Sequence, residues 1–407
     1  MSDSDAPGIL RGDCRMLNRA IHAKTNSAMS VRTLARNSFT DCCITGTIER
    51  YISTSQPIEA MYADAARILA EHSIQPIQEK IYAHRRVREH ALDVRKKAFL
   101  ANGLDPALPV TFVDGKPLVD QPIAGLQIWG IVPHDPIASD VATVECGNGW
   151  TGRMWTVNGS RMLYLPALAG TRKDGQVALS TTEQAQRMFD NANQALESLG
   201  FSYQQVVRTW IYLARILDWY GEFNRVRTLH HANVGIGRDL ESSTFPASTG
   251  IQGRSLDYEC FMDVLAVDPA PATSVAVDSI RNSSHQGQAF AYGSAFSRGV
   301  TLALEERKTV FISGTASIDA EGRTMHLDDP GCQCLETLQA VAAVLEDQGG
   351  SLEDICTAAI FFKDQETYQA YQRLVRQLCL PQFPTICVRA DVCRPELLCE
   401  IEPVAFI

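Results

Sequence analysis

The sequence predicts an α+β protein built from three similar units, each a sheet with two helices on one face. Two observations support this prediction. The order strand–helix–strand–helix–strand–strand recurs three times along the 407 residues. The helices carry apolar positions at a spacing of three to four, whereas the strands are short, continuous apolar runs. Because each layer leaves one sheet face uncovered, we expect the three sheets to pack together as a pseudo-trimer around a sheet-lined core.

The clearest copy of the repeat is C-terminal. It opens with a strand over residues 308–318 (KTVFISGTASI), which ends in a bend of small residues. A helix is expected over 329–349, because Leu335, Leu338 and Val341 recur at helical spacing and a Gly-Gly pair follows them. A buried strand, an amphipathic helix and two closing strands complete the copy, at residues 355–363, 365–378, 385–392 and 397–407.

The other two copies repeat this order with less regular sequences. In the middle of the chain the six elements are expected at 162–170, 182–200, 203–213, 218–231, 248–254 and 260–267. Near the N-terminus they are expected at 40–48, 57–72, 79–84, 87–102, 110–113 and 126–132.

These copies divide the chain into an N-terminal extension and three domains. The extension has few periodic apolar positions, so we expect it to be partly disordered. The first domain is degenerate, and the last one carries the candidate active site. The four segments are residues 1–39, 40–135, 145–270 and 285–407.

Composition and charge exclude several classes of protein. Lys plus Arg number 37 against 47 Asp plus Glu, a net charge of -10, whereas a nucleic-acid binder usually carries a basic surface. No stretch approaches the ~20 apolar residues of a membrane span, and the N-terminus lacks the layout of a signal peptide. We therefore expect a cytoplasmic protein that binds neither nucleic acid nor membrane.

No motif for a metal or a cofactor is evident. The 12 cysteines include no CxxC pair, and many lie in apolar runs, where a free cysteine acts as a small core residue. His230, His231 and His326 lack spaced partners of metal-ligating type. Gly235 and Gly237 form a lone G-x-G without the rest of a dinucleotide fingerprint. We expect no metal and no cofactor.

Three phrases of the sequence, YGSAFSR, SGTASI and ADVCRPELLCEIE, resemble a known family. The third copy, and more weakly the other two, is similar to the Rid (reactive-intermediate deaminase) superfamily, whose members are homotrimers with active sites between subunits. The arrangement of the whole chain is most similar to the chorismatase or 3-hydroxybenzoate synthase family. This resemblance implies hydrolysis of chorismate to pyruvate plus a hydroxybenzoate or a dihydroxycyclohexadiene carboxylate.

The resemblance also implies roles for individual residues. Glu400 matches the glutamate that is the proposed acid in chorismatases, and Cys393 matches a cysteine of the hydroxybenzoate-forming branch. The middle copy has Phe261 in place of that glutamate, so one competent site is expected, on the third copy. Rid deaminases hold the substrate carboxylate with a Pro-x-Arg arrangement, which is lost at residues 384–386 and 246–248. Residues 319–322 stand where chorismatases continue with a histidine.

Alternation along the last strand predicts that Glu400 faces the neighbouring unit. Burial there would raise its pKa and allow it to act as a general acid. Arg254 and Arg298 each follow a Gly/Ser-rich bend and are our candidate anchors for the two substrate carboxylates. The resemblance gives Cys393 a role in departure of the ring substituent, although a buried inert thiol explains it equally well. Candidate hydrogen-bond donors are Tyr212, Tyr292, Gly314, Thr315, Ala316 and Ser317.

Two other functions remain open at this point. One is a Rid-type enamine or imine hydrolase or tautomerase, against which the lost arginine argues. The other is a non-catalytic protein that binds small molecules on a Rid scaffold, and a ribonuclease is the least favoured reading because the chain is acidic. In each favoured case the partner is a small-molecule carboxylate. We prefer a monomer over a homo-oligomer, since a closed pseudo-trimer has less need to associate.

Overall fold

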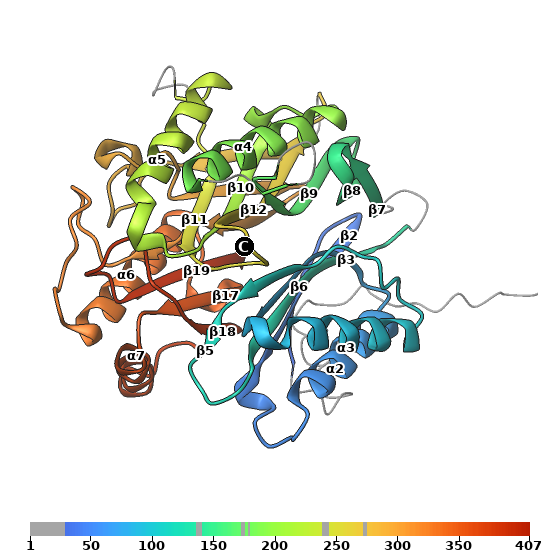
Figure 1. Ribbon diagram of the computed structural model, residues 1–407, viewed down its shortest axis with the longest axis horizontal. Coiled ribbons are helices and arrows are strands. Elements are labelled where there is room, and N and C mark those ends of the chain that lie inside the picture. The colour runs from blue at the N-terminus through green and yellow to red at the C-terminus, as the bar shows by residue number, and fades with distance from the viewer. Residues whose placement is uncertain (1–28, 136–140, 172–175, 178–179, 238–243, 272–274) are drawn as a thin grey trace, which may run out of the picture.

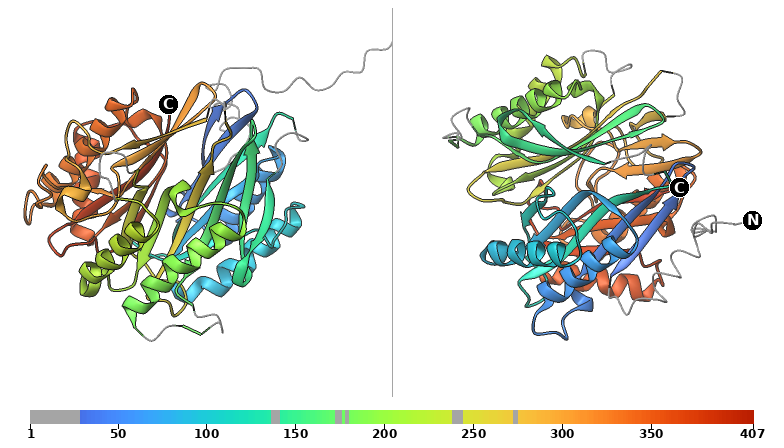
Figure 2. Two further views of the ribbon diagram at one scale, coloured as in Figure 1. Left: turned by 90° about the horizontal axis from the view of Figure 1, so that it is seen from above. Right: turned by 90° about the vertical axis from the view of Figure 1, so that its right-hand side faces the viewer.

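The computed structural model describes residues 29–135, 141–171, 176–177, 180–237, 244–271 and 275–407. Three pairs of helices lie on the outside of the molecule, and the sheets face its middle (Figure 1). The views at right angles show the same arrangement, with strands from the whole length of the chain side by side in the centre (Figure 2).

The first unit contains a five-stranded sheet in the order β1-β2-β6-β3-β4. Only its last pair, β3 with β4, is parallel. Its strands are β1 (Ser30–Ala35), β2 (Phe39–Thr47), β3 (Gln75–Ala83), β4 (Thr111–Asp114) and β6 (Ile123–Pro133), and its helices are α2 (Pro57–Glu71) and α3 (Arg88–Ala101).

The second unit repeats this topology with one more strand at the edge, in the order β7-β8-β9-β12-β10-β11. Again only the last pair, β10 with β11, is parallel. Its strands are β7 (Ala142–Cys146), β8 (Trp150–Val157), β9 (Ser160–Ala169), β10 (Val206–Leu213), β11 (Ala247–Gln252) and β12 (Cys260–Asp268), and its helices are α4 (Thr181–Ser198) and α5 (Ile216–Asn233).

The third unit has the order β13-β14-β15-β19-β17-β18, and the short β5 (Lys116–Pro117) of the first unit pairs with β18 at its edge. The chain therefore ties the first unit to the third sheet. Its strands are β13 (Val275–Ile280), β14 (Gly299–Leu304), β15 (Arg307–Ile312), β16 (Thr315–Ala316), β17 (Ile355–Phe362), β18 (Thr385–Arg389) and β19 (Cys399–Phe406), and its helices are α6 (Pro330–Asp347) and α7 (Gln365–Gln377).

Local sequence explains where the helices begin. The side chains of Ser180, Asp329 and Asp364 accept hydrogen bonds from backbone N–H groups in the first turns of α4, α6 and α7, which satisfies donors that have no partner within the helix. Pro57 and Pro330 stand at the first helical positions of α2 and α6, where a missing N–H costs nothing.

The central strands are buried on both faces. One face of each sheet packs on its own helix pair, and the other contributes to a single apolar cluster shared by all three sheets, with Tyr82, Trp155, Trp210, Phe311 and Phe361 among its members. The α+β class and the repeated element order are thus confirmed. Burying both faces explains why β10, β12 and β19 are nearly continuous apolar runs.

The N-terminal boundary differs from the prediction. Residues 30–35, assigned to an extension, form β1 and pair with β2, while residues 1–28 lie outside the described residues. The strands β7, β8, β13 and β14 were also not expected. All five lie at or next to a sheet edge. In β1, β7, β8 and β13 partly exposed positions dilute the apolar pattern that marks a strand, whereas β14 is almost entirely buried and its apolar run was overlooked.

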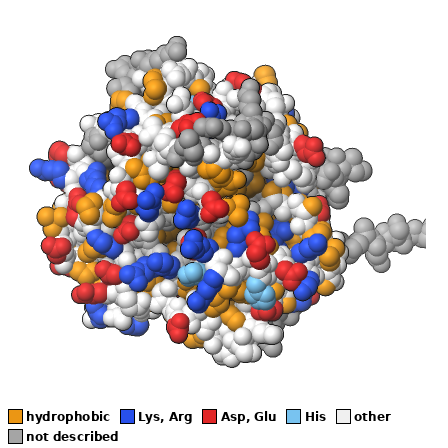
Figure 3. Space-filling view, viewed as in Figure 1, with side chains coloured by type: hydrophobic (Ala, Val, Ile, Leu, Met, Phe, Trp, Pro, Cys, Tyr) orange, Lys and Arg blue, Asp and Glu red, His pale blue; other side chains and the backbone are white. Residues whose placement is uncertain are grey.

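The surface mixes charges of both signs. On the face shown in Figure 3, Lys and Arg side chains are interspersed with Asp and Glu. Within the described ranges, none of the helices combines the length and apolarity that a membrane span requires.

Candidate active site

A small cavity of about 50 Å³ lies between the second and third units, beside Glu400. The second unit contributes residues of α5 and β11, and the third contributes the strand ends around β14 to β16 and the loop before β19. The structure therefore brings the predicted residues Glu400, Cys393, Arg298, Gly314 and Ala316 together at one cavity.

The Glu400 carboxyl group occupies space in this seam that is open only because Gly314 has no side chain. A Cβ atom at Gly314 would lie 2.2 Å from Glu400 Oε1, far inside van der Waals contact. The Glu400 residue is 4% exposed, and among the described residues its Oε1 has no hydrogen-bond partner. A buried carboxyl oxygen without a partner is costly when charged, so the neutral acid is the favoured form.

The surroundings of Glu400 fix its protonation state. Burial, reinforced by the charge of Glu402, raises its pKa to about 8, while Arg208 opposes this shift. Glu400 is therefore mainly protonated at neutral pH. A protonated carboxyl group that faces a cavity can donate a proton to a bound molecule.

Two buried arginines line the same cavity. Arg298, on the bend before β14, donates from Nε to the Gly287 carbonyl oxygen at 2.8 Å. Arg227, on α5, donates from Nη2 to Asn224 Oδ1 at 2.6 Å. Both guanidinium groups lie near the Phe296 ring, with Cζ 5.9 Å and 5.6 Å from its centroid respectively. This ring gives the two cations a common wall, and paired guanidinium groups suit carboxylate ligands.

Hydrogen bonds across the seam fix the strand that faces Glu400. The Ser248 N–H donates to Ser313 Oγ at 2.8 Å, and Ser313 Oγ donates to the Ser297 carbonyl oxygen at 2.6 Å. The Gly314 N–H donates to the Ser248 carbonyl oxygen at 3.2 Å. These contacts attach β11 of the second unit to the bend of the third, so both walls of the cavity are held in register.

Cys393 lines the cavity as a neutral thiol. Burial, together with the nearby Glu400, raises its pKa to about 12. A thiol with this pKa is not a nucleophile at neutral pH, because only the thiolate attacks. If Cys393 takes part in the reaction, it does so as a weak hydrogen-bond donor or through its shape.

Several residues predicted for the site are placed elsewhere. Arg254 does not line the cavity and forms an ion pair with Glu259 at 3.5 Å. Tyr212 stacks on Phe261, and its hydroxyl lies 3.3 Å from that of Tyr82. Tyr212 therefore supports the shared core, and Arg254 a partly exposed ion pair, rather than this cavity.

The remaining predicted donors also point away or are not described. Thr315 Oγ1 donates to the Ser313 carbonyl oxygen at 2.9 Å, and Ser317 Oγ donates to that of Met325 at 3.4 Å, so both hydroxyls stabilise the bend itself. Tyr292 ends a short helical turn, and its side chain lies outside the described residues.

Sequence reasoning named Arg254 and Tyr212 from the second unit but missed the residues of that unit that line the cavity. Arg227, Tyr220, Ser248 and Gly250 line the cavity from α5 and β11. Arg227 could have been found, since it occupies a buried helix position where an apolar residue is usual. His230 and His231, for which no metal role was expected, pack against the rings of Phe189 and Tyr203.

Next to the cavity, four charged residues are buried where the three units meet. Lys80 Nζ lies 3.8 Å from Asp263 Oδ2 and 3.9 Å from Glu402 Oε1, and Arg208 lies 3.7 Å from Glu402. Lys80 comes from the first unit, Asp263 and Arg208 from the second, and Glu402 from the third. This network connects Glu400 to all three units, because Glu402 and Arg208 act on its pKa in opposite directions.

Comparison with known proteins shows what the chain is similar to. Residues 287–407 match the family described as endoribonuclease L-PSP. A crystal structure of a chorismatase is similar with 21% sequence identity and a TM-score of 0.54, covering 74% of this chain and 88% of that chain. This likeness is one of fold.

Smaller proteins match one unit each. A member of the YjgF protein family from Neisseria meningitidis is 16% identical with a TM-score of 0.25, covering 32% of this chain and 95% of that chain. A member of the YjgF/YER057c/UK114 family from Mycobacterium tuberculosis is 22% identical with a TM-score of 0.26, covering 32% of this chain and 100% of that chain. The family model thus matches residues 287–407, and the chain as a whole has a fold similar to that of the chorismatase.

Proposed function

We propose that this protein is a chorismatase-like hydrolase, in which three Rid-like units form a pseudo-trimer and Glu400 is the general acid. The proposal rests on the environment of the Glu400 carboxyl group. This group is buried, has a pKa of about 8 and faces a cavity lined by Arg227 and Arg298. Because one chain supplies both walls of the seam, the proposed activity needs no second copy.

The reaction begins with proton transfer to carbon. Chorismate carries its enolpyruvyl group on an ether oxygen, and protonation of the terminal methylene carbon by Glu400 creates the methyl group of pyruvate and an oxocarbenium ion. Water adds to this cation, and its proton returns to Glu400. The hemiketal then breaks its bond to the ring oxygen and releases pyruvate and a dihydroxycyclohexadiene carboxylate, so one water is consumed.

The arginines supply positive charge to balance the two carboxylates of the substrate. Arg227 and Arg298 can each bind a carboxylate, and fixed cations in a dry seam act more strongly than in water. In the described structure the cavity of about 50 Å³ is smaller than the roughly 300 Å³ at which ligand pockets begin. We therefore expect its walls to move apart when substrate enters.

Cys393 bears on the choice of product. In the hydroxybenzoate branch the ring aromatises and an internal nucleophile replaces water, so pyruvate and hydroxybenzoate form without net consumption of water. The neutral Cys393 thiol at the cavity wall could orient the departing ring substituent. The product therefore reports whether this cysteine has a function.

The test is release of pyruvate from chorismate by the purified protein, followed with lactate dehydrogenase, together with chromatography of the ring product. Stoichiometric pyruvate supports the proposal, and 3-hydroxybenzoate would add a role for Cys393. Absence of pyruvate, or release of ammonia from 2-aminoacrylate in its place, would overturn it.

A further inference from the structure

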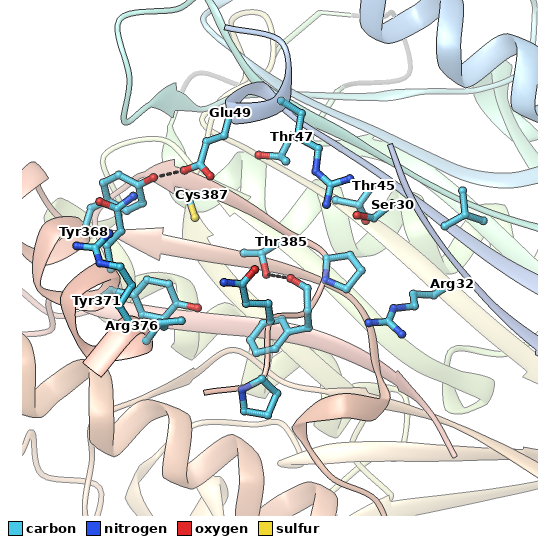
Figure 4. Close-up of a pocket in the computed structure, with 18 residues that line it drawn as sticks. Ser30, Arg32, Thr45, Thr47, Glu49, Tyr368, Tyr371, Arg376, Thr385 and Cys387 are labelled. Atoms are coloured by element: carbon cyan, nitrogen blue, oxygen red, sulfur yellow. Dashed lines mark hydrogen bonds between the residues drawn. The ribbon is translucent and has the colours of Figure 1, made fainter. Parts of the chain in front are cut away.

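A much larger cavity, of about 870 Å³, lies between the first and third units (Figure 4). One wall is formed by β1 and β2 of the first unit, and the other by α7 and β18 of the third. Its volume falls within the roughly 300–1,000 Å³ of ligand pockets. The proposed reaction at Glu400 makes no use of it.

Strand register places this cavity at the position that corresponds to the Glu400 cavity. Phe261 of the second unit corresponds to Glu400 of the third. Phe261 pairs with Tyr212, and Glu400 pairs with Phe361. Tyr212 and Phe361 therefore correspond as well, which aligns β10 with β17.

The parallel neighbours of these two strands, β11 beside β10 and β18 beside β17, can then be aligned residue by residue. Ser248 on β11 corresponds to Thr385 on β18, and Gly250 corresponds to Cys387. Ser248 and Gly250 line the Glu400 cavity, and Thr385 and Cys387 line the larger one.

The opposite wall matches in the same way. Pairing with the last strand of each unit makes Thr45 correspond to Gly314 and Thr47 to Ala316, and each of the four lines its own cavity.

The second helix of each unit contributes an arginine at the same place. Leu213 ends β10 and Phe362 ends β17, and α5 and α7 follow them at the same spacing. Arg227 and Arg376 lie equally far along the chain from these two residues, so the two arginines correspond. Arg227 lines the Glu400 cavity and Arg376 the larger one. The larger cavity is therefore a second version of the same seam, not an accident of packing.

The second version lacks the acid. Gly125 stands where Glu400 would be, and a Cβ on Gly125 would lie 3.0 Å from the Ile386 side chain, which fills the inner end of the seam. Ser30, which pairs with Thr45, lies on the wall that corresponds to the one carrying Arg298. Without a carboxyl group at this point, the cavity can bind a ligand but has no proton donor equivalent to Glu400.

The charges around the cavity favour an anion. Arg32 on β1 and Arg376 on α7 approach from opposite rims (Figure 4), and within the described residues neither guanidinium group has a carboxylate within 4.0 Å. Among the described residues that line the cavity, Glu49 is the acidic one, and it accepts a hydrogen bond from the Tyr368 hydroxyl. Tyr371 also contributes an aromatic ring to the wall.

We propose that this larger cavity is a non-catalytic binding site for an aromatic carboxylate, held by Arg32 and Arg376 with its ring against Tyr371. The ligand class follows from the lining: two cations that, among the described residues, have no carboxylate within 4.0 Å, and an aromatic ring on the wall formed by α7. The site goes beyond the proposed hydrolase activity and does not depend on it.

Binding is tested with fluorobenzoate and the full chain by fluorine NMR. We expect saturable binding with a Kd below about 1 mM, weakened about 10-fold or more by Arg376→Gln and by Arg32→Gln, since each loses a charge-assisted contact. Arg373→Gln is the matched control, because Arg373 is exposed on the same helix and does not line the cavity. Glu400→Gln should bind as tightly as wild type, which separates this site from failure of the proposed hydrolase.

Three results would overturn the proposal. They are absence of saturable binding, equal affinity in the Arg32, Arg373 and Arg376 variants, and binding that is lost in Arg227→Gln but kept in Arg376→Gln. Displacement of fluorobenzoate by equimolar inorganic phosphate would also contradict it, because the site would then be one for phosphate.

Discussion

At the scale of single residues, the account rests on the mutual fit of Glu400 and Gly314. Burial of an unpartnered carboxyl group keeps it protonated, and only glycine leaves room for it. The same contact explains why a bend of small residues follows β15: the bend does not provide hydroxyl groups to a ligand, as we expected for Thr315 and Ser317, but space for the acid.

Gly314→Ala should displace the Glu400 side chain and lower the rate of pyruvate release by about 100-fold, the usual effect of moving a reacting group by about 1 Å. Gly331→Ala is the control, because a Cβ there would meet its nearest atom, Asp329 Oδ1, at 3.5 Å, an ordinary contact. Steady-state kinetics and thermal melting of both variants separate the effect on activity from that on folding. Equal rates in both would show that the position of Glu400 does not matter.

The raised pKa of Glu400 also predicts how stability depends on pH. Its folded pKa of about 8 exceeds the ordinary value of 4.5, so the folded state binds the proton more tightly than the unfolded state does. This contribution is fully present below about pH 4.5 and is lost as the pH rises towards about 8. Urea unfolding at several pH values should show Glu400→Gln becoming more stable relative to wild type across this range. Parallel curves would contradict a buried acid.

At the scale of elements, β11 carries the wall that faces Glu400 and is attached to the third unit through Ser313. Ser313→Ala leaves the Ser248 N–H and the Ser297 carbonyl oxygen without their partner, so we expect a loss of about 1–3 kcal/mol of unfolding free energy. Ser279→Ala is the control, because the Ser279 hydroxyl makes only a long contact of 3.4 Å with the Phe245 carbonyl oxygen. Chemical denaturation measures both; a Ser313 variant as stable as the Ser279 variant would show that the seam does not depend on this hydroxyl.

The elements also show how far sequence reasoning reaches. Helix α6 and strand β19 were predicted within about two residues at most ends, because apolar spacing and caps are local signals. Strand β7 was not, since a largely exposed edge strand such as Ala142–Cys146 carries little apolar pattern. In the candidate site, Glu400 and Arg298 were predicted from their own unit, whereas Arg227 enters from another unit, and sequence spacing carries no information about which units face each other.

At the scale of the whole molecule, the buried network of Lys80, Asp263, Arg208 and Glu402 joins residues of all three units. Buried charges of this kind contribute little as a group, but removing one leaves its partners unpaired. The arrangement therefore links assembly of the units to the environment of Glu400.

Lys80→Met should lower the unfolding free energy by about 3–5 kcal/mol, because Asp263 and Glu402 would lose their buried cation. Lys97→Met, which breaks the exposed pair with Asp93, should cost no more than about 1 kcal/mol. Calorimetry or chemical denaturation compares the two. Similar losses in both variants would mean that the central network does not hold the units together.

The central claim is that a protonated Glu400 donates a proton to an enol ether. The most direct measurement is kcat for pyruvate release from chorismate by Glu400→Gln, beside Glu396→Gln, whose carboxylate accepts a hydrogen bond from Thr324 Oγ1 at 3.1 Å and does not line the cavity. The account predicts a loss of about 10²–10⁴-fold for Glu400→Gln with no loss of thermal stability, and near-wild-type kcat for Glu396→Gln. Undiminished pyruvate release by Glu400→Gln would contradict it.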